Sequence, residues 1–329
     1  MAFARTLRGD VAPETLGVVN AHDHLIRVGA GEVYIDPDHQ LDDVDKAVEE
    51  AGYFVEASKK WTHSGGTVVD MCPINCGRDI DKLAEVESRA DGLQVIAATG
   101  FHQEKVYLET ESHWVNRYSV DKIAELIIAD ITEGIDKHDY SGPEIERSEH
   151  KAGVIKVATA YGKITKFERK CIEAAAIASL ETGCPINTHT SAGTCGLEQA
   201  ELMISLGVPA ERIAIGHIQR NADIWLLTQI LKTGVYLELD GTARLKYQPE
   251  SNRIMEMREL GAAGYEDRIL LGTDSGKRSY QKAYGSTTGM DYNPAVDGPR
   301  MIDEGFDRAY VEKLLMVNGQ KFFTFGNGA

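Results

Sequence analysis

The chain alternates short apolar runs with helical patterns from one end to the other, and this alternation constrains its fold more than any other feature. Eight runs have the length of buried strands, and most are followed by apolar residues near the 3.6-residue period of a helix. The runs are GVVNAHDH, TVVDMC, LQVIAATG, GVIKVAT, PINTHT, RIAIGH, VYLELD and RILLGTD. Eight such units predict an α/β protein of the closed (β/α)8 type, a TIM barrel. A doubly wound open sheet is the alternative, although no G-x-G-x-x-G follows the first run to indicate a dinucleotide site.

No domain boundary or low-complexity tract interrupts this pattern. The 329 residues are long enough for two average domains or one large barrel, so length does not decide between them. We expect one barrel domain over residues 1–329, with active-site loops at the C-terminal ends of its strands.

The charge balance limits the classes of partner. With 35 Lys and Arg against 51 Asp and Glu, the formal charge is −16, which disfavours nucleic acid and anionic membranes. The N-terminal MAFARTLRGD lacks the apolar core of a secretory signal, and no run approaches the length of a membrane span. The five cysteines are scattered and odd in number, which argues against a disulfide framework and leads us to expect a reducing cytoplasm. Cys72 and Cys76 resemble half of a metal knuckle, but no second half exists, so we expect them to be structural.

Histidines and one aspartate close several of the runs. His22 and His24 are spaced i, i+2, which sends both rings to one face of a strand. Taken alone this motif is weak, because two histidines near a strand end are often incidental. His189, His217 and Asp274 close the fifth, sixth and eighth runs. Because barrel sites gather at the C-terminal ends of several strands, the five side chains predict a zinc-type ligand set.

Side-chain alternation predicts a shared inward direction for these residues. Ile213 and Ile215 fall on the same face of the sixth run as His217. Leu270 falls on the same face of the eighth run as Asp274.

A lysine lies in the middle of the fourth run. Val154 and Ala158 share a face with Lys156, so its side chain is expected to enter the barrel. A charged ammonium beside metals is costly through desolvation and repulsion. An unprotonated lysine can instead take up carbon dioxide and bridge two metals as a carbamate. The other interpretation is a lysine that extends to the barrel mouth, and spacing alone leaves both open.

Five segments together resemble a known family. NAHDHL, IKVAT, INTHTSAGT, AIGHIQRN and LLGTDSG, in this order and spacing, are similar to the phosphotriesterase family of the amidohydrolase superfamily, over nearly the whole chain. The resemblance implies a barrel with two divalent metals, zinc first and manganese, cobalt or iron as alternatives. It also implies a role for each ligand: His22, His24 and Asp274 for the more buried metal, His189 and His217 for the more exposed one, and carboxylated Lys156 as the bridge.

The implied reaction is hydrolysis of an ester or phosphoryl centre. A hydroxide bridging the metals attacks, and Asp274, as the catalytic residue, takes its proton towards the leaving group. The alternative role for Asp274 is as a ligand only. Organophosphate-degrading members carry an acidic residue and a histidine where this chain has Arg220 and Gly241, which disfavours triester hydrolysis. Homoserine-lactonase members usually have an arginine at the second of these positions, so Gly241 departs from them too.

Basic side chains gather in the two loops after the seventh and eighth runs. Arg244, Lys246 and Tyr247 lie in the first loop, and Lys277 and Arg278 lie in the second. In so acidic a chain they indicate an anion site, although ordinary solvated loop charge is the alternative. The pattern resembles family members that open phosphorylated sugar lactones, which is the function we expect.

Two further features complete the predicted site. His102, just past the third run, is expected to form a polar wall that contacts substrate rather than a metal. The stretch from about residue 275 to 300 contains Gly, Asn and Pro and is a candidate lid.

Several other functions remain open. A promiscuous lactonase or phosphotriesterase acting on neutral esters or organophosphates is the main alternative, followed by a mononuclear deaminase and by a binding protein without turnover. The expected partner is an anionic small molecule, and a homodimer is an open possibility.

Overall fold

Eight parallel strands form the centre of the fold in this computed structural model, which describes residues 2–107 and 113–326. Each strand pairs with the next along the chain. The strands are β3 (Val18–Asp23), β4 (Gly66–Asp70), β5 (Leu93–Gly100), β6 (Val154–Thr159), β7 (Ile186–Thr190), β8 (Ile213–Ile215), β9 (Tyr236–Leu239) and β10 (Ile269–Leu271).

The first and last strands come together, so that the sheet is nearly closed. The Asp274 N–H donates to the carbonyl of His22 at 2.9 Å, and the Thr273 N–H donates to the side-chain oxygen of Asn20 at 3.1 Å. The predicted (β/α)8 barrel is confirmed.

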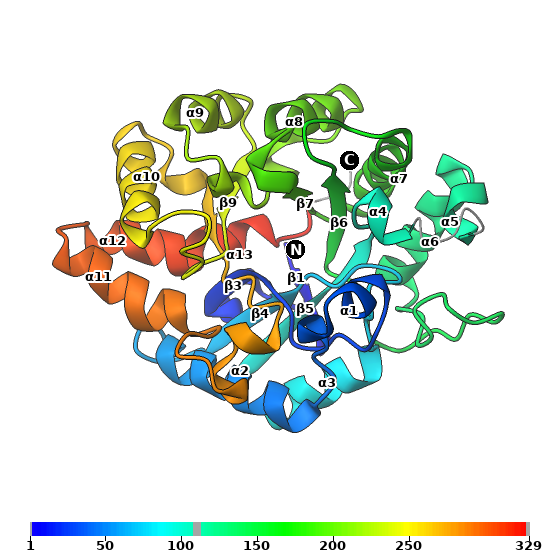
Figure 1. Cartoon of the computed structure of the whole chain (residues 1–329), viewed down its shortest axis with the longest axis horizontal. Helices are drawn as coiled ribbons and strands as arrows, with labels where there is room; N and C mark the ends of the chain where they lie inside the picture. Colours follow the sequence, from blue (N-terminus) through cyan, green and yellow to red (C-terminus); the bar gives the residue numbers. More distant parts are fainter. Residues whose placement is uncertain (1, 108–112, 327–329) are drawn as a thin grey trace.

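Helices surround the strands (Figure 1). Most of the longer ones follow the predicted pattern, and each lies between two strands of the chain order. They are α2 (Val44–Ser58), α3 (Ile80–Arg89), α6 (Val120–Thr132), α7 (Lys166–Thr182), α8 (Gly196–Ser205), α9 (Ile224–Lys232) and α10 (Glu250–Ala262). The C-terminal segment adds α11 (Gly298–Asp303), α12 (Arg308–Glu312) and α13 (Asn318–Phe322), and short helices α1 (Gly31–Ile35), α4 (Glu104–Tyr107) and α5 (Trp114–Arg117) lie in the loops.

The ends of α7 illustrate how local sequence sets these boundaries. The Thr165 hydroxyl accepts from the Glu168 N–H, and the Glu168 carboxylate accepts from the Thr165 N–H, which is a capping box. Gly183 ends the helix at φ +77°, a conformation that costs glycine little.

Several elements are not predicted by the sequence pattern, among them a hairpin and one long helix. The hairpin of β1 (Ala4–Thr6) and β2 (Gly9–Val11) has strands of three residues, too short to show a period. Helix α10 buries Arg253 and Glu256 together with its apolar residues, so its charged and apolar positions do not separate into two faces.

The barrel has an apolar core inside the strands and a larger one between strands and helices. Val154 and Leu270 lie in the inner core, as predicted for the faces that also carry Lys156 and Asp274. The prediction for β8 was wrong: Ile213 and Ile215 pack in the outer core. His217 follows the end of that strand with φ +56°, and this left-handed residue breaks the alternation on which the prediction depended.

Most of the candidate lid packs against α2. The Glu50 carboxylate of α2 accepts from the backbone N–H groups of Ala283 and Met290, and Trp61 donates to the carbonyl of Pro294. Of the stretch 275–300, only Gly276, Lys277 and Tyr280 line the central cavity. Among the described residues, no helix is long and apolar enough to cross a membrane.

Candidate metal centre

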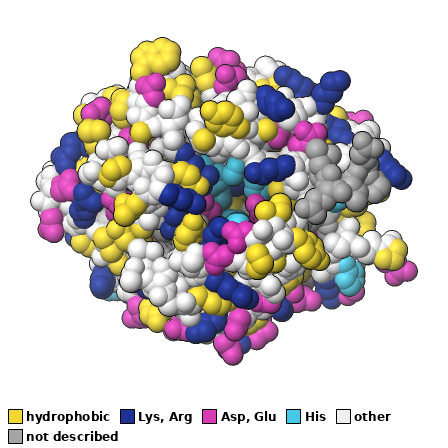
Figure 2. All heavy atoms as spheres, in the orientation of Figure 1, with side chains coloured by type: hydrophobic (Ala, Val, Ile, Leu, Met, Phe, Trp, Pro, Cys, Tyr) yellow, Lys and Arg dark blue, Asp and Glu magenta, His cyan; other side chains and the backbone are white. Residues whose placement is uncertain are grey.

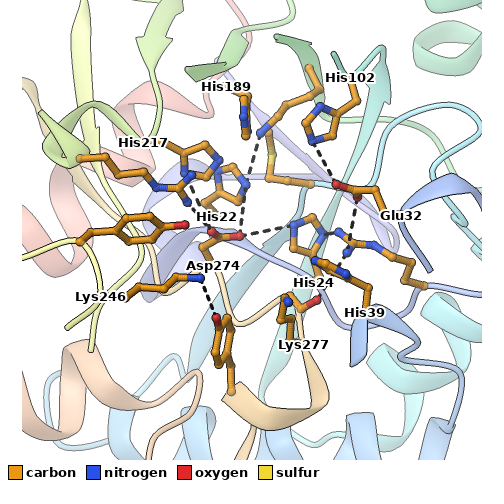
Figure 3. Close-up of a pocket in the computed structure, with 17 residues that line it drawn as sticks. His22, His24, Glu32, His39, His102, His189, His217, Lys246, Asp274 and Lys277 are labelled. Atoms are coloured by element: carbon orange, nitrogen blue, oxygen red, sulfur yellow. Dashed lines mark hydrogen bonds and ion pairs between the residues drawn. The ribbon is translucent and has the colours of Figure 1, made fainter. Parts of the chain in front are cut away.

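A cavity of about 170 Å³ lies at the C-terminal ends of the strands. Figure 2 shows histidine side chains at the bottom of a hollow that is bordered by basic and acidic groups. All six predicted metal ligands line this cavity: His22, His24, Lys156, His189, His217 and Asp274. Segments more than 250 residues apart therefore converge on one place, as Figure 3 shows.

An irregularity in β3 brings two of the histidines into the cavity. The register of β3 with β4 shifts between Asn20 and Asp23. After this shift His22 and His24 face the cavity, whereas Asp23 turns away and accepts from the Ser275 N–H at 2.9 Å. The His24 Nε2 lies 3.6 Å from the Asp274 Oδ1, and ligand atoms of His22, His24 and Asp274 all lie within 4.8 Å of one another.

One carboxylate in β9 and one directly after it hold histidine rings. The His22 Nδ1 lies 2.9 Å from Glu238, and the His217 Nδ1 lies 2.6 Å from Asp240. Asn187 donates to the other oxygen of Glu238 at 2.9 Å, so this carboxylate is placed to accept on both oxygens. When each Nδ1–H donates to its carboxylate, each Nε2 keeps a free lone pair, which is the arrangement that supports metal-binding histidines.

Burial keeps the histidines neutral. Desolvation lowers the pKa of His22, His24 and His189 well below the ordinary value, and nearby positive groups lower it further. Burial also lowers the pKa of His217. Neutral imidazole is the form that binds metals, so this donor set fits divalent ions.

Lys156 enters the barrel, as predicted. It is 1% exposed, and its Nζ lies 3.3 Å from the His22 Nε2. Burial lowers the pKa of the amine, and Glu238, Asp240 and Asp274 oppose this effect. The structure therefore does not agree with the alternative interpretation, in which Lys156 extends to the barrel mouth.

Asp274 is fixed in an uncommon conformation. Its φ is +46°, a left-handed value that is rare for residues other than glycine. Arg244 donates to the backbone carbonyl of Asp274 at 3.0 Å, and Arg220 donates to its carboxylate at 2.9 Å. These contacts hold the carboxylate over the histidines, where it can accept or return a proton.

One wall of the cavity carries positive charge. Arg220, Lys246 and Lys277 line it, together with Tyr247 and Tyr280. The Lys246 Nζ donates to the Tyr280 hydroxyl at 3.0 Å, and within the described part of the chain it has no carboxylate partner. Lys277, by contrast, is paired with Asp36.

The opposite wall contains polar groups that the sequence reasoning missed. Glu32 lines the cavity with His39, Arg27 and the predicted His102. Burial would raise the pKa of Glu32, but Arg27 and the neighbouring histidines lower it to about 2, so Glu32 is an anion at neutral pH. The sequence held an indication, because RVGAGEVY begins three residues after His24 and a loop there must lie over the strand ends.

A comparison with models of known protein families identifies the family of this chain. The model of the phosphotriesterase family matches residues 2–323. The chain belongs to the phosphotriesterase family. The predicted family is therefore confirmed, and with it the prediction that the chain is a hydrolase.

Similar proteins within the phosphotriesterase family include two named phospho-furanose lactonase. The one from Mycoplasmopsis synoviae is 39% identical over 290 residues, which cover 87% of this chain and 80% of the relative. The one from Mycoplasmopsis agalactiae is 37% identical over 330 residues, which cover 98% and 92%.

Solved structures of the phosphotriesterase type superpose closely on this chain. An amidohydrolase from Mycoplasma synoviae has a TM-score of 0.94 at 35% identity and covers 100% of this chain and 93% of its own. A lactonase from Listeria monocytogenes has a TM-score of 0.90 at 33% identity and covers 99% and 100%.

Two residues that we expected to bind substrate, Arg244 and Arg278, do not line the central cavity. Arg244 is 7% exposed and turns inward, where it supports Asp274 and lies 3.6 Å from the centre of the Tyr280 ring. Arg278 points away and pairs with Asp42 at 2.9 Å. Basic residues of the same two loops thus differ in whether they line the cavity, and composition cannot distinguish them.

Each cysteine of CPINC has a polar neighbour. Cys72 and Cys76 are both buried and free. The Cys72 Sγ lies 3.0 Å from the His24 Nδ1, and the Cys76 Sγ lies 3.4 Å from the Tyr107 hydroxyl. Cys72 therefore helps to orient a predicted metal ligand.

Proposed function

We propose that this chain is a metal-dependent lactonase that opens phosphorylated furanose lactones to the corresponding sugar-acid phosphates. The observation that carries the proposal is Lys246, a cation on the cavity wall without a carboxylate partner in the described chain. Two relatives named phospho-furanose lactonase support it. Neutral esters or organophosphates, the alternative substrates, would leave this cation without a partner.

The phosphate would bind along the positively charged wall. Lys246 supplies a point charge, and the Tyr280 hydroxyl beside it can donate a hydrogen bond. Lys277 adds a second ammonium, although its pairing with Asp36 reduces its contribution. The ring of the lactone would then lie over the histidines and Asp274.

The metal centre would be held by the six predicted ligands. Zinc is the expected ion, with manganese, cobalt or iron as alternatives. When bound, two divalent ions polarise the carbonyl of the lactone and lower the pKa of a water molecule. Lys156 would be carboxylated: its neutral amine attacks the carbon of carbon dioxide and loses a proton, which gives an anionic carbamate. The lowered pKa of the buried amine supports this step.

The residues of the chain would then handle the proton. The Asp274 carboxylate accepts a proton from the attacking water as the new C–O bond forms. The bond between the carbonyl carbon and the ring oxygen breaks, and Asp274 returns the proton to that oxygen. Arg220 and Arg244 keep the carboxylate in position during both transfers.

A matched substrate pair tests the proposal. We would measure kcat/KM for five-membered sugar lactones with and without a 5-phosphate, using metal-reconstituted enzyme. A charged hydrogen-bonded contact contributes about 1.5–3 kcal/mol, which corresponds to a preference of roughly 10- to 100-fold for the phosphorylated lactone. Equal values for the two lactones would contradict the proposal.

A further inference from the structure

A second polar subsite faces the cavity across from the cationic wall. Glu32 and His102 lie beside each other, with 3.9 Å between the Glu32 Oε1 and the His102 Nε2. Figure 3 shows this pair on the far side of Asp274 from Lys246. Neither residue belongs to the predicted ligand set, and both line the cavity.

A backbone hydrogen bond determines which nitrogen of His102 carries the proton. The backbone N–H of Gln103 donates to the His102 Nδ1 at 2.6 Å. That nitrogen is therefore an acceptor, and in the neutral ring the proton must lie on Nε2. The Nε2–H is the end of the ring that faces Glu32, so the cavity receives a hydrogen-bond donor at this point.

Glu32 is held in place as a hydrogen-bond acceptor. Its Oε2 lies 3.6 Å from the Arg27 guanidinium, which is itself 4% exposed. Arg27 is anchored in turn by a contact of 3.0 Å with His24. The carboxylate is thus held at the cavity as an anion, with its Oε1 directed to His102.

The distance within the pair leaves room for a bridging group. At 3.9 Å the two atoms are too far apart for a direct hydrogen bond. One oxygen about 2.8 Å from each atom would sit in a bent bridge between them. It must accept from His102 and donate to Glu32, and a hydroxyl group does both.

We propose that Glu32 and His102 form a subsite that recognises the C2 hydroxyl of the lactone. This inference rests on the proposed function, which places the carbonyl carbon over the metal ligands and the 5-phosphate at Lys246. In a 1,4-lactone the phosphate extends from C4, and C2 lies across the ring from C4. The C2 hydroxyl is therefore the ring substituent directed to the wall opposite Lys246, where the pair lies.

Two pairs of lactones test the subsite in wild-type enzyme and in Glu32→Gln. The first is a pentono-1,4-lactone 5-phosphate and its 2-deoxy analogue. The second is α-hydroxy-γ-butyrolactone and γ-butyrolactone, which lack phosphate. We expect Glu32→Gln to lower kcat/KM about 10- to 100-fold for the hydroxylated member of each pair, because a hydrogen bond to a charged acceptor is lost. The analogue without the hydroxyl should change less than about 3-fold.

Two further variants separate recognition from structure. His102→Phe keeps a ring but removes the donor, and it should lose the same discrimination as Glu32→Gln. Glu104→Gln alters a nearby acid that does not line the cavity, and it should leave both pairs unchanged. A 3-deoxy lactone phosphate should still respond to Glu32→Gln as its parent does.

The outcomes distinguish the two proposals. Equal loss on the hydroxylated and deoxy members would overturn the subsite, because Glu32 would then act only through the shape of the site. If the 2-deoxy lactone phosphate responded to Glu32→Gln as its parent does while the 3-deoxy lactone phosphate did not, the assignment to C2 would be overturned. If phosphate makes no difference but the hydroxyl discrimination still depends on Glu32, the phosphate proposal fails and the subsite is supported. Absence of turnover on every lactone would overturn both.

Discussion

The floor and the walls of the cavity are built in different ways. The floor comes from strand ends, and its histidines are held by buried carboxylates such as Glu238 and Asp240. The walls come from loops, where Lys246 contacts aromatic groups and, among the described residues, has no carboxylate partner, and Glu32 is held by Arg27. Rigid strands with buried partners suit the chemical step, whereas loops can vary the substrate without disturbing that step.

Substitutions in the floor and in the walls should therefore have different consequences. Changes in the floor should reduce kcat or metal affinity for every substrate. Changes in the walls should alter the ranking of substrates and leave the metals in place.

The largest effect is expected for Asp274→Asn, in the floor. The amide keeps the shape of the side chain but cannot accept a proton as a carboxylate does, so kcat should fall by about 10²- to 10⁴-fold for all lactones. Steady-state kinetics on metal-reconstituted enzyme measures this, with metal content as the control. Turnover within a few-fold of wild type at full metal content would remove the proton-transfer role.

Glu238→Gln should weaken metal binding by about 10- to 100-fold. The amide brings a donor to a position where the His22 ring and Asn187 both require an acceptor. Competition with a chromophoric chelator gives the affinity. Glu256→Gln alters a buried glutamate of α10 that does not line the cavity, and it should leave the affinity unchanged. Equal affinities in the two variants would show that Glu238 does not orient a ligand.

In the wall, Lys246→Met should raise KM for phosphorylated lactones by roughly 10-fold, because one charged contact is lost. KM for lactones without phosphate should change little, and the metal content should stay the same. A parallel rise in KM for both kinds of lactone would argue that Lys246 shapes the cavity rather than binds the phosphate.

The smallest effect is expected for Arg278→Met, the matched control for Lys246→Met. Arg278 points out of the cavity and is 40% exposed, so KM should stay within about 2-fold of wild type. The free energy of unfolding should fall by less than about 1 kcal/mol, since exposed ion pairs contribute little. Chemical denaturation checks the second value. A rise in KM as large as that of Lys246→Met would mean that the loop adopts another conformation with substrate.

The sequence predicts the floor better than the walls for a physical reason. Strand ends in a barrel have a fixed direction, so Lys156 and His189 could be assigned to the cavity from alternation and order alone. The prediction that His217 lines the cavity agrees with the structure, but its reason was wrong. The left-handed backbone of His217 after β8, and not alternation, directs its side chain inward.

Loop side chains lack such a constraint. Lys277 enters the cavity while the next residue, Arg278, pairs with Asp42 outside it. That choice depends on which acidic groups the other loops bring close, and Asp36 and Asp42 come from a segment more than 230 residues away. Local spacing carries no information about such a contact.

The central claim is that six side chains from the ends of five strands hold two cations, with Lys156 between them. The metal content of chelated and reconstituted protein, measured by plasma mass spectrometry for wild type and for Lys156→Met, tests it most directly. We expect about two divalent ions per chain in wild type and one or fewer in the variant. A wild-type content of one ion, or a variant that retains both, would contradict the claim.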